Sequence, residues 1–492
     1  MKKQSSVKFA IDILFSALPP LVAKFSSYIL LPLISKVMGS VLYGVWQQFS
    51  VTTTFFLRLT SLNVGTGLKK YLTKNIEHEI IEREFSSVIS FVIILALLVS
   101  SVFFLFREDF SLWIFGQSGF EQLAILIVFF LPIETLLNEY SNFLRGQRLN
   151  KLLSIYSSLR HLTKILVLSC SILFFKKIEF IIGFFILTEF SWLMIFLYKV
   201  HIKLGYRFVN PHFKLVKKYL KFGIPLLVGS LGIWLTALSD RYLILYFLDI
   251  RSVGIYSGAY VLGSVALLLV RPITQVLLPD FSLLVSKGDF STIEKRLNTL
   301  LKLYATGALF FILINYLFAD VLLIAMSNKD FLEGIIVMKV VTIGIAAYGF
   351  MQLLNSVLSA LNKKSNFGFF WLIIGGINII SNIVLIPKLQ LLGAAISTLI
   401  SYTLGSIIFV VLTKKQIAIK FNLVMFFKLL AVLICILLIG TGIKQYDIAN
   451  YFFVVVMCSL FFGGFYLIAL YKLNFFTSNE KLFFLKLKSK IF

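Results

Sequence analysis

Residues 41–67 read VLYGVWQQFSVTTTFFLRLTSLNVGTG. This stretch has the length and apolar character of a membrane-spanning helix. It opens beside Tyr43 and Gly44 and carries a single charge, Arg58, deep inside it. A charged side chain at the centre of a bilayer costs about 2.5–3.5 kcal/mol, so it usually faces a cavity and marks a functional position. The stretch therefore predicts a membrane protein with a cationic cavity in its interior.

The same layout recurs in the second half of the chain. Residues 253–284 read VGIYSGAYVLGSVALLLVRPITQVLLPDFSLL. Here Arg271 follows Tyr256 by fifteen residues, just as Arg58 follows Tyr43, and the offset between the two pairs is 213 residues. Two arginines at equivalent places indicate two related halves around a central cavity that accepts an anion.

Composition excludes a water-soluble globular domain. Hydrophobic residues make up 59% of the 492 residues, charged residues make up 14%, and the mean hydropathy is +0.94. Soluble domains typically carry about 25% charged residues. The three cysteines lie in apolar runs, so they predict neither a disulfide framework nor a metal cluster.

Hydrophobic runs separated by short polar turns predict an all-α integral membrane protein with about fourteen transmembrane helices. Proline and glycine inside several runs agree with this prediction, because membrane bundles tolerate them. The expected spans are residues 9–35, 41–67, 85–106, 121–144, 152–175, 178–198, 219–248, 253–284, 297–319, 333–361, 366–387, 391–413, 424–443 and 451–471.

Basic residues are distributed unequally between the two sides of this arrangement. Of the 47 lysines and arginines, 30 fall in connecting segments on one side, 8 on the other side and 9 within the expected spans. Cytoplasmic loops of membrane proteins carry such an excess. The bias predicts that both termini are cytoplasmic. Together with attraction to anionic lipids, it explains the net charge of +25 without a nucleic-acid partner.

The repeat divides the chain into two lobes. Leu136-Leu137-Asn138, near the end of the fourth expected helix, matches Leu353-Leu354-Asn355 near the end of the tenth. Six helices return the chain to the same side, so the halves are expected to be two parallel copies with a substrate site between them. The basic connection between them is either a hinge or an amphipathic interfacial stretch. The expected domains are an N-lobe at 1–200, a cytoplasmic linker at 201–221, a C-lobe at 222–415, and two appended helices with a cytoplasmic tail at 416–492.

Basic residues outnumber acidic ones inside the expected spans, and a water-filled cavity for an anionic substrate explains the excess. Arginine suits this role because its planar fork binds phosphate through two hydrogen bonds and keeps its charge. We expect Lys24, Arg58 and Arg271 to line one cavity. The further candidates for substrate binding are Arg241, Arg160 and Lys164.

Carboxylates within the spans are candidates for a different role. Intramembrane acidic residues often serve as proton relays, so Glu134, Glu189 and Asp240 are candidates for proton or ion coupling. Structural alternatives stay open. Asp240 and the adjacent Arg241 are expected to point to different faces of one helix and to pair with other helices. Glu134 or Glu189 can instead donate a hydrogen bond to a backbone carbonyl. The arginines of the repeat can also reach lipid headgroups.

The sequence contains no catalytic constellation. It has no glycine-rich phosphate loop with a lysine, no nucleophile elbow and no zinc-binding helix. The four histidines show no metal-ligand spacing. These observations predict a protein that is not an enzyme, uses no cofactor or metal, and does not hydrolyse ATP itself.

Several segments resemble those of a known family, the bacterial polysaccharide flippases. These are the Wzx-type members of the multidrug/oligosaccharidyl-lipid/polysaccharide export superfamily. The resemblance extends from about residue 10 to residue 415 and implies a V-shaped pair of six-helix lobes that alternate between inward-open and outward-open states. The segments that carry it are LYG at 42–44, DRYLI at 240–244, VGIYSGAY at 253–260, IP at 386–387 and LGAAIST at 392–398.

The resemblance also implies a substrate and a location. Members of this family move undecaprenyl-pyrophosphate-linked sugar units, such as O-antigen repeats, from the cytoplasmic to the periplasmic leaflet of the bacterial plasma (inner) membrane. The implied partners are this lipid-linked glycan, membrane lipids, and polysaccharide polymerase or export proteins. Fourteen helices rather than twelve are a departure from the resemblance. Lipid II flippases and some polysaccharide exporters of the superfamily have fourteen, so the helix number leaves the precise substrate open. Two alternatives stay open: multidrug or metabolite antiport, and a membrane enzyme of the O-antigen polymerase type.

Overall fold

The computed structural model describes the backbone of residues 2–73, 76–175, 177–361, 368–420, 423–444, 452–473 and 475. Within these ranges, the side chains of residues 2–18, 20–21, 269, 271–272, 275–276, 423, 443–444 and 452–454 are not described. Every regular element in the described part of the chain is helical. The elements are α1 (Lys2–Ser61), α2 (Val64–Tyr71), α3 (His78–Leu105), α4 (Arg107–Phe115), α5 (Glu121–Gly146), α6 (Asn150–Phe174), α7 (Ile178–Leu197), η1 (Tyr198–Lys203), α8 (Phe213–Leu238), α9 (Asp240–Phe247), α10 (Ile250–Gly263), η2 (Ser264–Ala266), α11 (Leu267–Ser286), α12 (Phe290–Met326), η3 (Lys329–Gly334), α13 (Ile335–Leu361), α14 (Gly368–Lys414), α15 (Leu423–Lys444) and α16 (Phe452–Lys472).

The helices account for the fourteen predicted crossings. Eleven described helices are long and apolar enough to cross a membrane. Two of them, α1 with 60 residues and α14 with 47, contain a non-helical residue, at Gly39 and Gln390 respectively. At 1.5 Å per residue, straight helices of these lengths would span about 90 and 70 Å, far more than a bilayer core of about 30 Å. Each therefore supplies two crossings, and the broken helix α10–η2–α11 supplies one more.

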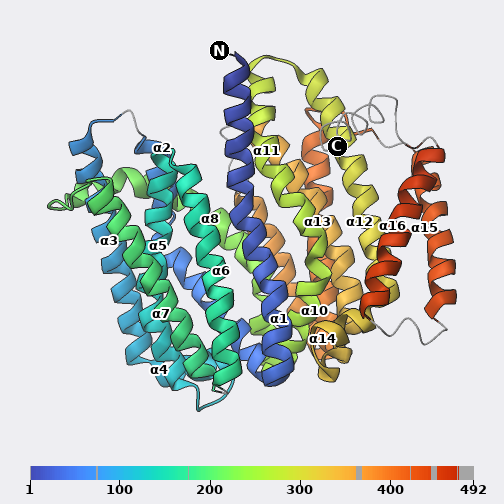
Figure 1. Cartoon of the computed structure of the whole chain (residues 1–492), viewed down its shortest axis with the longest axis horizontal. Coiled ribbons are helices and arrows are strands. Elements are labelled where there is room, and N and C mark those ends of the chain that lie inside the picture. The colour runs from blue at the N-terminus through green and yellow to red at the C-terminus, as the bar shows by residue number, and fades with distance from the viewer. Residues whose placement is uncertain are drawn as a thin grey trace.

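The two halves of the chain lie side by side. In Figure 1 helices α2 to α7 occupy the left, most of the later helices occupy the right, and the first part of α1 runs down the middle. The helix α1 begins, and α16 ends, at the same face, which we call the terminal face (Figure 1). The helix α1 runs from the terminal face to the opposite face and turns back there (Figure 1), and the non-helical residue inside it is Gly39. The arrangement confirms an all-α membrane protein with an even number of crossings.

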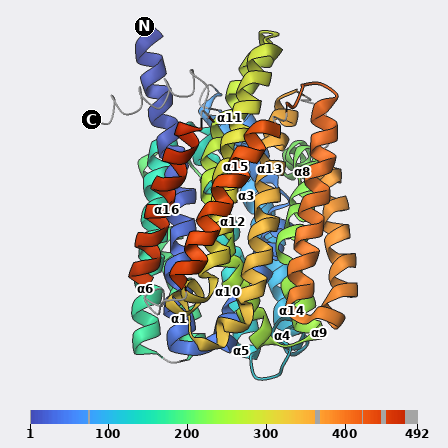
Figure 2. The same cartoon turned by 90° about the vertical axis from the view of Figure 1, so that its right-hand side faces the viewer.

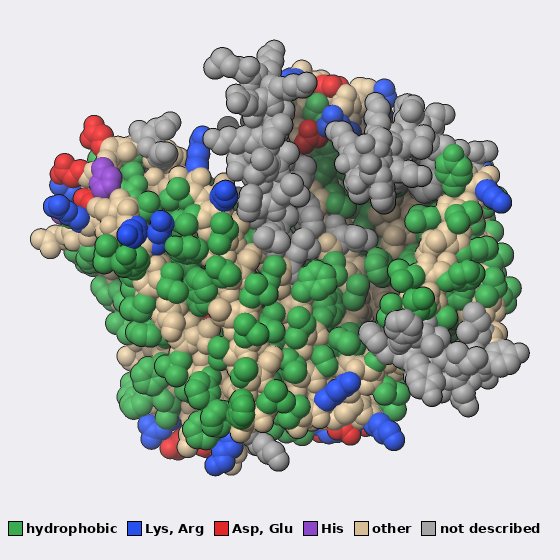
Figure 3. Space-filling model, in the orientation of Figure 1, with side chains coloured by type: hydrophobic (Ala, Val, Ile, Leu, Met, Phe, Trp, Pro, Cys, Tyr) green, Lys and Arg blue, Asp and Glu red, His purple; other side chains and the backbone are tan. Residues whose placement is uncertain are grey.

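The surface of the molecule matches a bilayer. Figure 3 shows hydrophobic side chains over the middle of the visible face, and most of the charged side chains near its upper and lower edges. Many large hydrophobic residues are exposed on the helices, such as Leu97 and Leu98 on α3 and Leu187 on α7. These side chains would be costly in water and are stable in lipid, so the protein is a multi-pass membrane protein.

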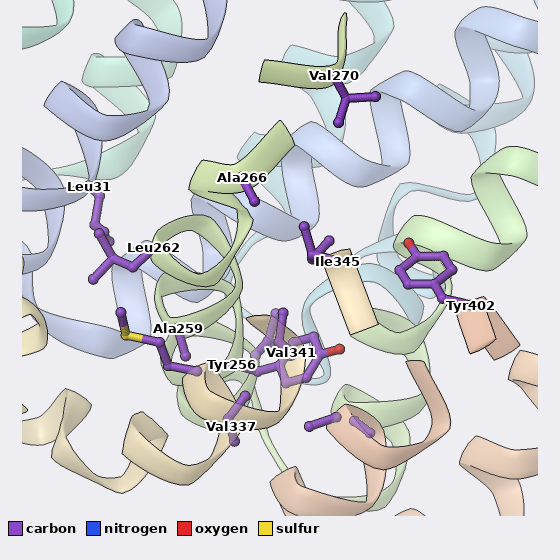
Figure 4. Packing of buried hydrophobic residues seen from close by; sticks show 14 of the residues in the cluster. Leu31, Tyr256, Ala259, Leu262, Ala266, Val270, Val337, Val341, Ile345 and Tyr402 are labelled. Atoms are coloured by element: carbon purple, nitrogen blue, oxygen red, sulfur yellow. The ribbon is translucent and has the colours of Figure 1, made fainter. Parts of the chain in front are cut away.

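The buried core joins the two halves. One hydrophobic cluster contains Leu31 of α1, Tyr256 and Leu262 of α10, and Val341 of α13. Figure 4 shows these side chains together, with Ala259 and Ile345 beside them. A second cluster lies within the N-terminal half, between α2, α3, α5 and α7. The first cluster places helix α1 at the boundary between the two lobes.

Helix α8 begins within the residues predicted as the linker, 201–221. The helix α8 begins at Phe213 rather than near residue 219, because its charged first turns extend beyond the apolar part of the sequence. Residues 204–212 form no helix in the structure. Their backbone N–H groups donate to side chains of α3: Arg207 to Glu82 over 2.6 Å, and Val209 to Ser86 over 3.1 Å. This connection is therefore fastened to the N-terminal lobe and is not an amphipathic helix.

The last two helices form an appendage on α12. Side chains of α15 and α16 share a separate hydrophobic cluster with Leu313, Leu317 and Phe318 of α12, and Figure 2 shows both helices on the outer side of the C-terminal half. Lys428 Nζ donates to the carbonyl oxygen of Leu473 over 2.8 Å, at the end of α16. This lysine satisfies a carbonyl that the helix end leaves without an intrahelical partner.

Candidate functional site

The lobes approach each other closely where α1 crosses α10. A Cβ atom built on Gly44 would collide with the carbonyl oxygen of Ile250, and one built on Gly254 would collide with that of Ser40. Each glycine thus faces the residue four positions before the other glycine. This near-symmetric contact relates the halves by an offset of 210 residues, close to the 213 of the repeated tyrosines and arginines.

Further contacts hold the lobes together around this crossing. The ring of Tyr43 meets the ring of Phe331 edge-on, with centroids 6.0 Å apart. The hydroxyl groups of Thr52 on α1 and Tyr242 on α9 lie 2.5 Å apart. Because Tyr43 and Gly44 lie within five residues of Gly39, the crossing is near the face opposite the terminal face. The lobes are therefore closed together at that face.

Lys24 and Arg58 lie on the two limbs of α1. They are 15 and 19 residues from Gly39 in opposite directions. At 1.5 Å per residue, these separations place them about 22 and 28 Å from the turn, at similar depths. Lys24 Nζ donates to Ser264 Oγ of η2 over 2.8 Å, so Lys24 connects α1 to the C-terminal lobe.

Arg58 lies closer to the end of its helix than the sequence suggests. Leu62 and Asn63 adopt left-handed backbone conformations, with φ of 44° and 55°, and these end α1 at Ser61. Arg58 is consequently in the last turn of α1. Its Nε atom is buried, and no side-chain hydrogen bond or ion pair joins Arg58 to another residue in the described part of the chain.

Arg271 lies in α11, shortly after the helix resumes from its 3₁₀ segment η2. Its side chain is outside the described residues. Whether it faces Lys24 and Arg58 therefore stays a prediction.

Asp240 and Arg241 form a buried ionic cluster at the start of α9. They were expected to pair with other helices, but Arg241 NH1 donates to Asp240 Oδ1 over 2.5 Å. Both residues also contact a second helix, α10. The Tyr256 hydroxyl donates to Asp240 Oδ2 over 2.6 Å, and the Arg241 guanidinium lies over the ring of Tyr260 at 4.4 Å. Adjacent residues can meet here because they are the first two of a helix, where the side chain of Asp240 folds back toward free N–H groups.

The remaining predicted residues meet inside the N-terminal lobe. Arg160 of α6 donates through Nε to Glu189 of α7 and through NH2 to Glu134 of α5. Lys164, one turn further along α6, lies over the ring of Phe185 at 4.4 Å. Arg160 and Lys164 are four residues apart and lie on one face of α6, where Arg160 is paired with the two carboxylates. One oxygen of each glutamate is bonded to Arg160, and the alternative of a hydrogen bond from either glutamate to a backbone carbonyl is not observed in the described structure.

These four residues border a cavity of about 190 Å³. A single water needs roughly 10–15 Å³ on this measure, so the space accommodates a group much larger than water. One wall is the second limb of α1. The complete lining is Trp46, Phe49, Ser50, Thr53, Thr54, Leu57, Phe130, Glu134, Arg160, His161, Lys164, Phe185 and Glu189.

Two buried features were missed from the sequence. Tyr256 was noted only as a marker of the repeat, yet its hydroxyl also lies 3.2 Å from Thr398 and ties α10 to α14. Glu139 of α5 is completely buried, its Oε1 accepts a hydrogen bond from Asn138, and its Oε2 has no partner among the described residues. Its position inside the expected span 121–144 was the available signal. Among the described residues, no three histidine, cysteine or acidic side chains cluster as metal ligands would.

The chain matches a known family over more than half of its length. The family model of polysaccharide biosynthesis proteins matches residues 11–285. No curated protein matches the sequence.

Solved structures with the same fold are membrane transporters. The lipid II flippase MurJ in an inward closed conformation aligns with 94% of this chain and 98% of its own, at 19% identity and a TM-score of 0.72. A multidrug resistance MATE family transporter of the MOP superfamily, in an inward-facing conformation, aligns with 82% of this chain and 94% of its own, at 13% identity and a TM-score of 0.61. A MOP superfamily transporter from Pyrococcus furiosus aligns with 82% and 95%, at 14% identity and a TM-score of 0.57. These likenesses establish the fold.

Proposed function

Because the chain belongs to the family of polysaccharide biosynthesis proteins, we propose that it is a flippase for a lipid-linked oligosaccharide. In this proposal the substrate is an undecaprenyl-pyrophosphate-linked glycan. The protein moves it from the cytoplasmic to the periplasmic leaflet of a bacterial plasma membrane by alternating access. The terminal face is the cytoplasmic one, in agreement with the excess of basic residues in its loops.

The observation that carries this proposal is the state of Arg58. Two of the other three arginines predicted inside the lobes are neutralised, Arg160 by two glutamates and Arg241 by Asp240, and the side chain of the third, Arg271, is outside the described residues. Arg58 has no such partner among the described residues, although its Nε is buried. A buried donor without a partner is costly, by about 1–3 kcal/mol and more for a charged group. A pyrophosphate bound beside Arg58 would remove that cost.

Lys24 and Arg271 complete the proposed anion site. Lys24 bridges from α1 to Ser264 in the break between α10 and α11, and Arg271 follows this break by a few residues. A site on both lobes would sense their relative motion, because opening the lobes would separate its members. This property is what alternating access requires.

The glycine crossing supports the same mechanism. It closes the lobes at the face opposite the terminal face, where a tight backbone contact between α1 and α10 leaves no space for a substrate. Release to the outer leaflet therefore needs Gly44 and Gly254 to separate. Glu134, Glu189 and Asp240 stay candidates for coupling this motion to an ion, and each would first have to exchange its arginine partner.

The test is export by arginine variants. A strain without its chromosomal copy would carry wild-type protein, Arg58→Ala or Arg58→Lys, and surface polysaccharide would be measured with membrane abundance checked in parallel. Charge-assisted hydrogen bonds contribute roughly 1.5–3 kcal/mol each, so Arg58→Ala should weaken pyrophosphate binding about ten- to a hundredfold and reduce export. Arg58→Lys should retain part of the export, because a point charge replaces the fork.

The matched control is Lys428→Ala, which removes a cation from the appendage and should leave export near the wild-type level. Arg271→Ala should reproduce the loss seen in Arg58→Ala. Full export by abundant Arg58→Ala and Arg271→Ala proteins would remove the proposed anion site.

A further inference from the structure

We propose that the cavity inside the N-terminal lobe binds one neutral sugar ring of the substrate. This inference rests on the proposed function, since it assigns a second contact to the same lipid-linked glycan. The cavity lies between α1, α5, α6 and α7 and is separate from the cationic residues Lys24 and Arg58.

The charges around the cavity balance. Arg160 and Lys164 contribute two positive charges, and Glu134 and Glu189 contribute two negative ones. Because both carboxylates are bonded to Arg160, this guanidinium is not available as a fork for a phosphate. A neutral ligand suits this environment better than an anion, since an anion would meet two carboxylates at close range.

The polar groups of the lining can still form many hydrogen bonds. Each glutamate keeps a second oxygen and further lone pairs that can accept hydrogen bonds from hydroxyl groups. The Lys164 ammonium has three N–H donors, and among the described residues it forms ring contacts but no hydrogen bond. The Thr53 and Thr54 hydroxyls donate to backbone carbonyls of their own helix, so their lone pairs face the cavity as acceptors. A ligand with several hydroxyl groups matches such a mixture of donors and acceptors.

Aromatic rings form the remaining walls. Trp46 packs against Phe185 with centroids 5.7 Å apart, and Phe130 packs against the same ring at 5.2 Å. The C–H faces of a pyranose are apolar and lie well against such rings, while its rim of hydroxyl groups needs polar partners. Small-ligand sites commonly combine apolar and aromatic walls with a few convergent polar groups in this way.

The cavity has an opening on the side of α1. Ser50 is exposed, and Thr54, one turn further along, is partly exposed. Glu189, by contrast, is only 3% exposed and forms the far wall. A sugar ring would therefore enter past Ser50 and Thr54 and reach the ionic network with its hydroxyl groups.

A residue that fills the opening tests the proposal without changing any charge. Thr54→Phe should reduce export of surface polysaccharide at least about tenfold. The purified variant should still bind farnesyl pyrophosphate, a probe without a sugar, as tightly as the wild-type protein does. The matched control is Thr188→Phe on α7, where the threonine hydroxyl also donates to the carbonyl four residues earlier but is outside the lining.

A second variant that fills the same opening keeps the test possible if Thr54→Phe misfolds. Ser50→Phe replaces an exposed residue of the same opening and should reproduce the loss if Thr54→Phe does not reach the membrane. Normal export by either folded filling variant would overturn the sugar pocket. Loss of farnesyl pyrophosphate binding together with export would also overturn it, because the cavity would then belong to the anion site. If wild-type protein neither exports polysaccharide nor binds the probe, the proposed function fails, and the pocket fails with it.

Discussion

Replacing Gly44 by alanine should weaken the closed contact between the lobes. A Cβ atom at this position would collide with the carbonyl oxygen of Ile250 and would lie 3.1 Å from the backbone nitrogen of Gly254. Both neighbours are backbone atoms, so no side chain can rotate away. Inserting a methyl group into such a tight contact costs about 1–3 kcal/mol. At about 1.36 kcal/mol per factor of ten, the closed state should lose about 5- to 150-fold in population relative to the open state.

Labelling of a buried cysteine measures this shift. Thr52 is completely buried at the lobe interface, so Thr52→Cys in a variant without the three native cysteines should react slowly with a membrane-impermeant maleimide added from outside. Adding Gly44→Ala should accelerate the reaction about 5- to 150-fold, because the open state exposes the thiol more often. The control is Gly376→Ala on α14, where a Cβ atom meets nothing within 4 Å. Equal labelling rates with and without Gly44→Ala, in folded protein, would refute the idea that this crossing is the closed gate.

Three further predictions concern stability, topology and the appendage. Arg160→Met should lower the free energy of unfolding by about 3–5 kcal/mol, because the buried Glu189 and the partly buried Glu134 would lose their partner. Thermal unfolding in detergent would measure the loss, and adding glutamine at both glutamate positions should recover most of it. A cysteine at Gly205 should be labelled only from the cytoplasm, and labelling from outside would overturn the lobe assignment. A chain that ends after Lys415 should keep some polysaccharide export, since α15 and α16 pack on the outside of α12; no export from properly inserted truncated protein would place these helices in the mechanism.

Much of the fold could be predicted from the sequence because it depends on local properties. Fourteen crossings follow from the length of each apolar run, and the lengths expected for the spans agree closely with helices such as α5 and α7. Two breaks inside long helices were predictable as well, because Gly39 and Gln390 fall between expected spans, whereas the break at η2 lies inside one. Helix α1 turns at Gly39, where a glycine with φ of 82° allows a conformation that other residues avoid. The break at η2 falls at Gly263-Ser264, a kind of pair at which helices can bend, but Gly229-Ser230 lies inside the unbroken helix α8, so such a pair does not specify a break by itself.

The sequence by itself determined which residues are charged inside the membrane, but the tertiary structure decided which of them are neutralised. Arg160 meets Glu134 and Glu189 from two other helices, and no spacing along the chain specifies that encounter. Arg58 and Arg160 look alike as single charges in apolar runs. Arg160 nevertheless has two carboxylate partners, whereas Arg58 has none among the described residues. Periodicity sets the face of a helix that a side chain occupies, whereas ion pairing depends on which helices pack against that face. The repeated glycines show the same division, because their sequence context marks a duplication, while only packing reveals that the two copies touch each other.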